Sequence, residues 1–324
     1  MKKSINEKIF LDPSKQLYLY GYSKYFDFFK KMLYTKQLPQ CLLLYGSKGL
    51  GKATFAYHLA NYILSINENN KYDYSNYEIN PKNSSFNRIQ SNVHPNFFLI
   101  GGNNNDENVK IEQIRNLLRF VNRSTFESNL KVVLIDNIEN LNLNSSNALL
   151  KAIEEPTTNT FFLIIHDNAH KISETIKSRC TQFKIHFSIT EKEIIFSKLF
   201  NQFSKDLNSP EIKHDFYLNT PGNLIRYISL LDDAKESDCK DTLSNINFFL
   251  DKYLSSKNPF LLYFAVTNIE KFYYEILINK TDKLVYENFN LIKILRKIDE
   301  MKKFNLEQKN TFIWIKDILQ NDAE

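Results

Sequence analysis

Residues 41–64 read CLLLYGSKGLGKATFAYHLANYIL, and this stretch decides the fold. It opens with a continuous apolar run, as expected of a strand that is buried on both faces of a sheet. The next residues match the pattern G-x-x-x-x-G-K, and apolar residues at helical spacing continue to Ile66. A glycine-rich loop between a strand and a helix is the setting of a phosphate-binding loop. The stretch therefore predicts a P-loop fold.

The glycines and the lysine of this loop are the residues that would hold a nucleotide. Gly46, Gly49 and Gly51 allow backbone N–H groups to converge on phosphate oxygens, and the helix N-terminus adds partial positive charge. Lys52 would reach the outer phosphates. Because these residues are all present, weak ATP binding stays open.

The position after the lysine departs from the pattern. It normally carries serine or threonine, whose hydroxyl binds Mg²⁺, whereas this chain has Ala53. Thr54 follows, but one position along a helix is a rotation of ~100°, so its hydroxyl should point elsewhere. We therefore expect a degenerate nucleotide-binding site that lacks its usual magnesium ligand.

A second motif, KVVLID, ends at Asp136. Four apolar residues that end in aspartate are typical of a Walker B strand, which places the carboxylate at the metal. In AAA+ ATPases a glutamate follows and polarises the attacking water, whereas this chain has Asn137, and Glu139 lies two residues further on. The alternative interpretation is a buried strand that ends in a turn-forming aspartate.

The first half of the chain alternates strand and helix patterns. The strand-like runs are residues 41–45, 97–100, 132–135, 161–165 and 182–187, and the helical stretches are residues 53–66, 111–122 and 145–155. Continuous apolar strands that are separated by helices indicate a parallel sheet covered on both faces. A polar, Asn-rich segment interrupts the alternation at residues 67–92, and we interpret it as an inserted loop.

After about residue 188 the strand patterns stop. Thr190 and Glu193 form a capping-box pattern that predicts the start of a helix. From about residue 237 onwards, apolar residues recur at three- and four-residue spacing. We therefore expect an α/β P-loop domain at residues 1–187, a small helical domain at residues 188–236 and an all-α domain at residues 237–324.

Six segments of the first 187 residues match one family together. They read LPQCLLLYGSKGLGK, VHPNF, VKIEQIRNLLRFV, KVVLIDNIENL, SSNALLKAIEEP and TIKSRC. They resemble the AAA+ clamp-loader family, and most of all its delta-prime type subunits in bacterial DNA polymerase III. The pair ALLKAIEEP (148–156) and SRC (178–180) is highly specific after a P-loop, whereas the helical remainder matches by layout alone.

This resemblance implies a three-domain subunit: a RecA-like AAA+ domain, a small helical lid and a helical collar that joins a five-membered ring. The ring would include motor subunits of gamma or tau type and a delta subunit. It would use ATP to open a sliding clamp and place it on primer–template DNA during replication. In the family, the arginine of SRC projects into the ATP site of the neighbouring subunit, and that position here is Arg179.

Several departures from the family point the same way. Ala53 and Asn137 replace two catalytic positions, and the lid arginine of a G-x-x-R motif falls at Ile225, one residue before Arg226. We therefore expect a subunit that hydrolyses little or no ATP. Many relatives also carry a four-cysteine zinc module after the P-loop helix. Residues 67–92 contain no cysteine, so we expect no zinc and no other metal site.

The bulk composition restricts the function less than the motifs do. The net charge of +5 permits contact with nucleic acid without indicating it, since Lys and Glu are interspersed. The three cysteines form no C-x-x-C pair, which fits a reducing cytoplasm and no disulfide framework. The longest apolar runs are far short of the ~20 residues that span a bilayer, so no membrane contact is expected.

Three functions compete at this point. The first is a non-hydrolysing clamp-loader subunit that donates Arg179 to a neighbour. The second is an active AAA+ motor ATPase, which Ala53, Asn137 and Ile225 disfavour. The third is a P-loop adaptor outside replication. For Arg179 itself, the alternative to a role in trans is a local ion pair, for example with Glu174.

Overall fold

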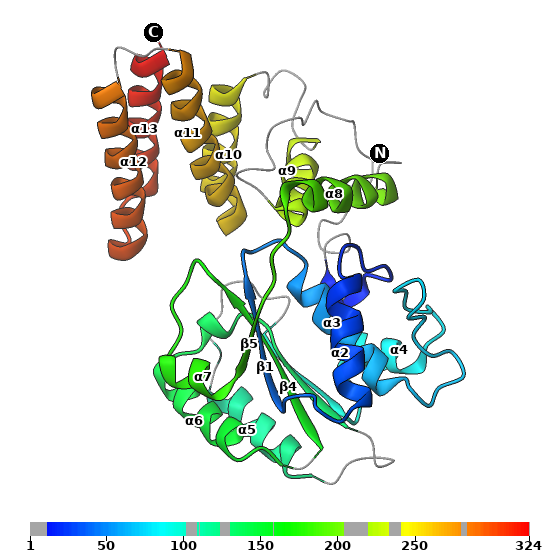
Figure 1. The fold of residues 1–324 in the computed structure, drawn as a ribbon. Helices are drawn as coiled ribbons and strands as arrows, with labels where there is room; N and C mark the ends of the chain where they lie inside the picture. The colour runs from blue at the N-terminus through cyan, green and yellow to red at the C-terminus, as the bar shows by residue number, and fades with distance from the viewer. Residues whose placement is uncertain are drawn as a thin grey trace. The chain divides into compact units, whose positions relative to one another are not determined.

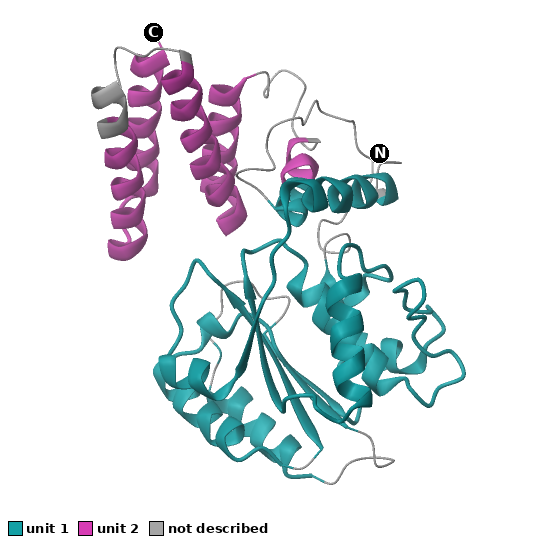
Figure 2. Cartoon of the chain, in the orientation of Figure 1, with its two compact units in different colours: residues 1–226 teal, residues 227–324 magenta. Residues whose placement is uncertain are grey.

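The computed structural model describes most of the chain, and Figure 1 shows its fold. The described residues are 12–101, 109, 111–123, 130–157, 159–203, 220–232, 241–279 and 284–323. Contacts group the chain into two compact units, residues 1–226 and residues 227–324 (Figure 2). Each unit has a hydrophobic core of its own.

A five-stranded parallel sheet forms the centre of the first unit. The strands are β1 (Cys41–Gly46), β2 (Phe97–Ile100), β3 (Lys131–Ile135), β4 (Thr160–Asp167) and β5 (Thr181–Lys184). Their order is β2-β3-β4-β1-β5, and all paired neighbours run parallel. The first four strands coincide with apolar runs of the sequence, because a strand that is covered on both faces presents no polar side.

Helices cover both faces of this sheet (Figure 1). One face packs against α2 (Ser23–Tyr34), α3 (Lys52–Leu64) and α4 (Ser84–Gln90), and the other against α5 (Ile111–Val121), α6 (Leu143–Glu154) and α7 (Glu174–Arg179). Two short 3₁₀ helices are η1 (Pro13–Lys15) and η3 (Ile138–Asn140). Alternate residues of β1 point to opposite faces of the sheet. Leu42 and Leu44 belong to the core on the side of α2, α3 and α4, and Leu43 belongs to the core on the other side. The predicted α/β class is confirmed.

The segment at residues 67–92 contains regular structure that its composition does not reveal. An antiparallel bridge joins Asp73 to Glu78, and α4 occupies the last part of the segment. A helix of seven residues has too few apolar positions to show a helical period, which is why the sequence predicted only a loop.

Asn83 holds the start of α4. Its side chain is fully buried, and Oδ1 accepts hydrogen bonds from the Phe86 backbone N–H at 2.7 Å and from Asn61 Nδ2 at 3.0 Å. Its own Nδ2 donates to the Asn70 carbonyl at 2.7 Å. One amide therefore joins the helix cap, the preceding loop and α3, since asparagine satisfies both donors and acceptors.

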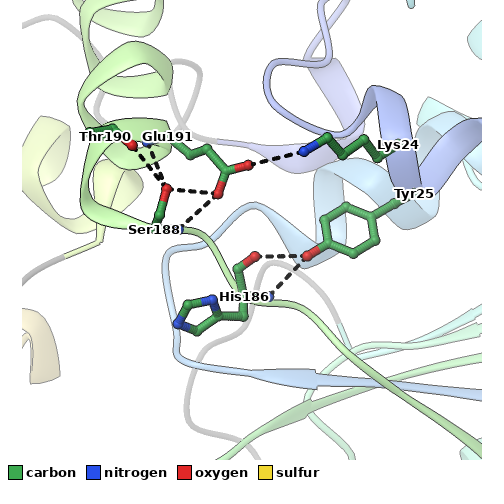
Figure 3. Close-up of polar contacts among 6 residues, drawn as sticks. All are labelled: Lys24, Tyr25, His186, Ser188, Thr190 and Glu191. Atoms are coloured by element: carbon green, nitrogen blue, oxygen red, sulfur yellow. Dashed lines mark hydrogen bonds and ion pairs between the residues drawn. The ribbon is translucent and has the colours of Figure 1, made fainter.

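The chain leaves the sheet after β5 through a short segment that two contacts fix (Figure 3). The Tyr25 hydroxyl of α2 donates to the His186 carbonyl at 2.7 Å. Ser188 and Glu191 then form a capping box: the Glu191 carboxylate accepts from the Ser188 N–H at 2.8 Å, and the Ser188 hydroxyl accepts from the Glu191 N–H at 3.3 Å. α8 (Ile189–Phe203) follows.

The predicted capping box at Thr190 and Glu193 is therefore wrong by two residues. Both pairs fit the pattern S/T-x-x-E, but Thr190 already lies inside α8. The sequence pattern alone does not distinguish the two registers. In the structure, Lys24 lies 3.8 Å from Glu191, and this contact favours the capping box that Ser188 and Glu191 form.

The regular structure of the second unit is helical in the residues that the structure describes. It contains α10 (Thr242–Ser256), α11 (Pro259–Asn279), α12 (Leu284–Phe304) and α13 (Gln308–Ala323). Its core is rich in aromatic and branched side chains, among them Phe249, Phe264, Ile294, Phe312 and Ile315. The helical C-terminal part that the sequence predicted is confirmed.

The boundary between the two units falls inside α9 (Pro221–Asp232), after residue 226. The sequence predicted boundaries after residues 187 and 236 instead, and that three-domain division stays a prediction. Among the described residues, no helix combines the length and the apolarity that crossing a membrane would require.

We predict that Asn83→Ala lowers the free energy of unfolding by roughly 2 kcal/mol, because it removes a helix cap and leaves buried polar groups unpaired. Urea denaturation measures this loss. Asn87→Ala is the matched control: Asn87 is exposed on the same helix and donates only at 3.4 Å to the Pro81 carbonyl. Its change should stay within about 0.5 kcal/mol. Equal losses in both variants would contradict the role of Asn83.

Candidate nucleotide-binding site

The glycine-rich loop joins the end of β1 to the start of α3, as the sequence predicted. Gly49 and Gly51 have φ angles of +84° and +88°, which L side chains rarely adopt. A Cβ atom at Gly49 would also lie 2.2 Å from Thr220 Oγ1. These glycines are therefore required by the backbone of the loop, whether or not a phosphate binds there.

Lys52 lies folded onto its own loop. Its Nζ donates to the carbonyls of Gly46 at 2.6 Å and of Ser47 at 2.8 Å. The side chain is buried, and the loss of water lowers the pKa of Lys52 to about 8. Nearby carboxylates, Asp167 first among them, oppose this lowering. The ammonium group is thus held at the loop by carbonyl oxygens and by negative charge.

Ala53 and Thr54 are the second and third residues of α3. The Ala53 methyl group is partly buried and packs against the core that includes residues of α2, α3 and α4. It offers no oxygen to a cation. Thr54 lies one helix position further on, where the sequence predicted that its hydroxyl turns away.

Asp136 stands at the same edge of the sheet, directly after β3. Its backbone N–H donates to the Ile100 carbonyl at 2.9 Å, which continues the ladder between β3 and β2. Part of the Asp136 surface stays exposed. Desolvation is the larger cause and repulsion from Glu139 the smaller cause that raise the pKa of Asp136 to about 6. The lysines of the loop, Lys52 and Lys48, act in the opposite direction.

Asn137 occupies the position of the expected water-polarising glutamate. Its φ angle is +57°, in the left-handed region, and it caps η3. Asparagine tolerates this conformation better than most residues because its short side chain can bond locally. The residue therefore fits a turn, and its carboxamide cannot act as a base.

Glu139 is the nearest other carboxylate on this segment, and β4 engages it. Its Oε2 lies 3.3 Å from His166 Nδ1 and accepts from the Asp167 backbone N–H at 3.4 Å. Both side chains of the Glu139–His166 pair are less than a tenth exposed. A carboxylate that is held in this way is already committed to a structural contact.

His166 and Asp167 were not identified from the sequence. They end the apolar run of β4, which pairs with β1 so that Gly46 faces Asp167. The carboxyl ends of parallel strands meet at one edge of the sheet. The polar residues that directly follow or end each apolar run could therefore have identified these two residues as candidates. The apolar run of β4 ends in His166 and Asp167, and the apolar run of β3 is likewise followed by an acidic residue, Asp136.

The start of α9 lies directly on the glycine-rich loop. Thr220 Oγ1 donates to the Lys48 carbonyl at 2.8 Å, and the Gly222 N–H donates to the Gly49 carbonyl at 3.0 Å. A Cβ atom at Gly222 would lie 2.7 Å from that same carbonyl. Ile225, the position expected for a lid arginine, is buried. Backbone groups of the loop are thus bonded to α9.

Arg179 lies at the opposite edge of the sheet. It ends α7, immediately before β5, and β5 pairs with β1 from Leu42 and Thr181 onwards. The structure therefore brings Gly46, Lys52, Asp136 and Asn137 together at the carboxyl edge and keeps Arg179 away from them. A parallel sheet separates these edges by the length of its strands.

The Arg179 side chain forms a local ion pair, but not with the predicted partner. Its Nε lies 2.6 Å from Glu154 Oε1 at the end of α6, and its Nη1 donates to the Thr175 carbonyl at 3.1 Å. Glu174 binds Lys177 instead, at 2.7 Å. The Arg179 side chain remains 38% exposed, so it is accessible from outside the chain.

Comparison with known proteins agrees with this fold and with these motifs. The family described as "DNA polymerase III, delta subunit" matches residues 21–188, which is more than half of the chain. The chain belongs to this family. The resemblance that the sequence motifs predicted is therefore confirmed.

The similar curated proteins include both delta-prime and motor-type subunits. DNA polymerase III subunit delta' of Pseudomonas aeruginosa is 31% identical over 146 residues, which cover 45% of this chain and 43% of the relative. DNA polymerase III subunit gamma of Buchnera aphidicola subsp. Acyrthosiphon pisum is 31% identical over 190 residues, 58% of this chain and 52% of the relative. The matches thus span about half the length of these relatives.

Among solved structures, a DNA polymerase III gamma subunit-related protein from Thermotoga maritima aligns over 92% of this chain and 99% of its own, with a TM-score of 0.48 and 16% identity.

We predict that Asp136→Asn raises the free energy of unfolding at pH 8 by roughly 1–2 kcal/mol. The pKa of Asp136 is about 6 in the folded chain, above the ~3.9 of an unfolded aspartate. The folded state therefore binds more protons between these values, and ionisation costs stability as the pH rises through them. At pH 3 both states are protonated and the gain should vanish.

Urea denaturation at the two pH values measures this difference. Asp299→Asn is the matched control, since Asp299 is an exposed aspartate of α12 that pairs with Lys303 at 3.8 Å. Its effect should stay within about 0.5 kcal/mol at either pH. A loss of stability for Asp136→Asn at pH 8 would contradict the costly burial of this charge.

Proposed function

We propose that the protein is a clamp-loader subunit of DNA polymerase III that hydrolyses little or no ATP itself. It would support ATP-driven loading of a sliding clamp onto primed DNA and would donate Arg179 to the ATP site of a neighbouring subunit. One observation carries the first part: the loop and the lysine of a nucleotide site are present, but Asn137 stands at the position of the water-polarising glutamate and β4 holds Glu139, the carboxylate that follows it.

Three residues at one edge of the sheet support a low rate of hydrolysis. Ala53 supplies no hydroxyl to Mg²⁺, and Asn137 supplies no base. Glu139 is the carboxylate that follows, and His166 and the Asp167 backbone hold it. Without the glutamate that polarises water and the hydroxyl that binds Mg²⁺, phosphoryl transfer to water should be slow.

The contacts of α9 with the loop also limit nucleotide binding. The Lys48 and Gly49 carbonyls bond to the start of α9, and Lys52 bonds to the Gly46 and Ser47 carbonyls. Phosphates would have to draw Lys52 away from these partners. Weak binding is compatible with this arrangement, whereas tight binding would require α9 to rearrange.

Arg179 suits a role in trans for two reasons. It lies at the edge of the sheet opposite its own P-loop, so it cannot serve its own site. Its ion pair with Glu154 joins two side chains that are 38% and 42% exposed. Pairs of this kind contribute about 0–1 kcal/mol, so a phosphate group could replace the carboxylate at little cost.

The partners follow from the proposed role. Motor subunits of gamma or tau type and a delta subunit would complete a hetero-pentamer, and contacts with the clamp and with DNA would come through that complex. The helical second unit would serve as the collar. The competing function is an active motor ATPase, which the similarity to gamma subunits favours.

An ATPase assay separates these two functions. We predict that the purified chain turns over ATP at least ~10²-fold more slowly than a gamma-type motor subunit under the same conditions, because it lacks a base and a metal ligand. Lys52→Ala is the control and should leave the residual rate unchanged. Turnover within tenfold of the motor subunit that Lys52→Ala abolishes would establish the motor function instead.

The role of Arg179 requires the reconstituted complex. We predict that Arg179→Ala preserves thermal stability and ring assembly but reduces clamp loading and DNA-stimulated ATPase severalfold or more. An arginine of this kind contributes ~10³–10⁵ in rate at one site. The ATPase rate of the whole complex should fall by less, because only one site of the ring depends on Arg179. Arg179→Lys should restore little, since an ammonium lacks the planar fork.

Two further variants distinguish this role from a local one. Arg115→Ala removes another exposed arginine, which pairs with Glu112 at 3.3 Å, and should change nothing. Glu154→Ala frees the Arg179 guanidinium without removing it, so loading should persist. Normal loading by Arg179→Ala, or a loss of its fold, would show that Arg179 is structural. Failure of the chain to co-purify with motor and delta subunits would refute the whole proposal.

A further inference from the structure

Two cysteines that are far apart in the sequence lie side by side at the amino edge of the sheet. Cys41 is the first residue of β1, and Cys180 directly precedes β5. The two strands are parallel, and Leu42 pairs with Thr181, so Cys41 and Cys180 occupy the preceding step of the same register. Neighbouring strands are ~4.8 Å apart, which falls within the ~4.4–6.8 Å between the Cα atoms of disulfide-bonded cysteines.

The side chains meet as well. Both cysteines belong to the core beneath α5, α6 and α7, and both are buried. Their sulfur atoms lie 2.9 Å apart, and one thiol donates a hydrogen bond to the other. The backbone register and the side-chain contact are separate observations, and both place the two sulfurs within bonding reach.

The hydrogen bond makes the two thiols unequal. It lowers the pKa of Cys180 and, together with burial, raises the pKa of Cys41. Cys180 is thus the better nucleophile, and Cys41 is the thiol that keeps its proton. Both residues are largely buried, so a small oxidant such as hydrogen peroxide is the suitable probe.

We propose that Cys41 and Cys180 are an oxidisable dithiol, which a peroxide converts to an intramolecular disulfide beside Arg179. The Cys180 thiolate attacks one peroxide oxygen: an S–O bond forms, the O–O bond breaks, and water leaves after protonation. The Cys41 sulfur then attacks the Cys180 sulfur: an S–S bond forms, the S–O bond breaks, and a second water carries away the Cys41 proton. Two thiols lose two electrons, and the peroxide gains them.

The consequence concerns the end of α7. Cys180 caps this helix, with its N–H bonded to the Lys177 carbonyl at 3.3 Å, and Arg179 is the residue before it. A disulfide would tie this end to the start of β1 through a covalent bond. The backbone that carries Arg179 would then move less. This inference concerns the isolated chain and does not depend on the proposed clamp-loader function.

The test uses the full chain with Cys239→Ser, which removes the third cysteine and leaves only this pair. After native exposure to hydrogen peroxide and removal of the oxidant, the protein is denatured and its free thiols are counted. We expect the two thiols to disappear together, a mass lower by two hydrogens, and a non-reduced peptide that joins Cys41 to Cys180. Dithiothreitol should restore both thiols.

Single replacements and amide exchange complete the test. Cys41→Ser should stop the reaction at oxygen adducts on Cys180, because no second thiol remains. Hydrogen exchange of the peptide that covers α7 should slow in the oxidised form. If a single replacement fails to fold, the peptide map of the Cys239→Ser chain decides alone. Two intact thiols after peroxide exposure, or oxygen adducts on Cys180 with Cys41 still reduced, would overturn the proposal.

Discussion

The placement of β1 between β4 and β5 is the constraint on which the rest of the first unit depends. Both faces of β1 are buried, so its residues are apolar, and only its two ends can carry chemistry. The carboxyl end becomes the glycine-rich loop, and the register with β4 sets Asp167 beside Gly46. The amino end meets the last turn of α7 through the register with β5. The two candidate sites, with different chemistry, thus share one strand.

Several charged groups influence one another at the carboxyl edge of the sheet. Lys52 is a buried cation, and the charges of Asp167, Glu139 and Asp136 oppose the lowering of its pKa by desolvation. Desolvation, and after it repulsion from Glu139, raises the pKa of Asp136, and the Lys52 charge opposes this increase. Lys52 also bonds to the Gly46 and Ser47 carbonyls, so it has a structural role in the loop whether or not a nucleotide binds.

The sequence predicted the sheet, the P-loop and the positions of Lys52 and Asp136, because apolar runs and glycines are local signals. Other features depend on contacts between distant segments. The pairing of Arg179 with Glu154 rather than Glu174 reflects how α6 packs on α7, and no spacing in the sequence encodes it. The Glu139–His166 pair likewise joins residues 27 positions apart. A short helix such as α4 gives too little periodicity to be seen.

The backbone at Asn137 also limits which nearby sequences could become ATPases. Its φ of +57° suits asparagine, whereas glutamate in that conformation would cost about 1–2 kcal/mol. A substitution that restored the acid would therefore meet a strained turn, and the Lys48 and Gly49 carbonyls of the loop would still be bonded to α9. The left-handed backbone at Asn137 and the contacts of α9 with the loop thus restrict this edge of the sheet in two independent ways.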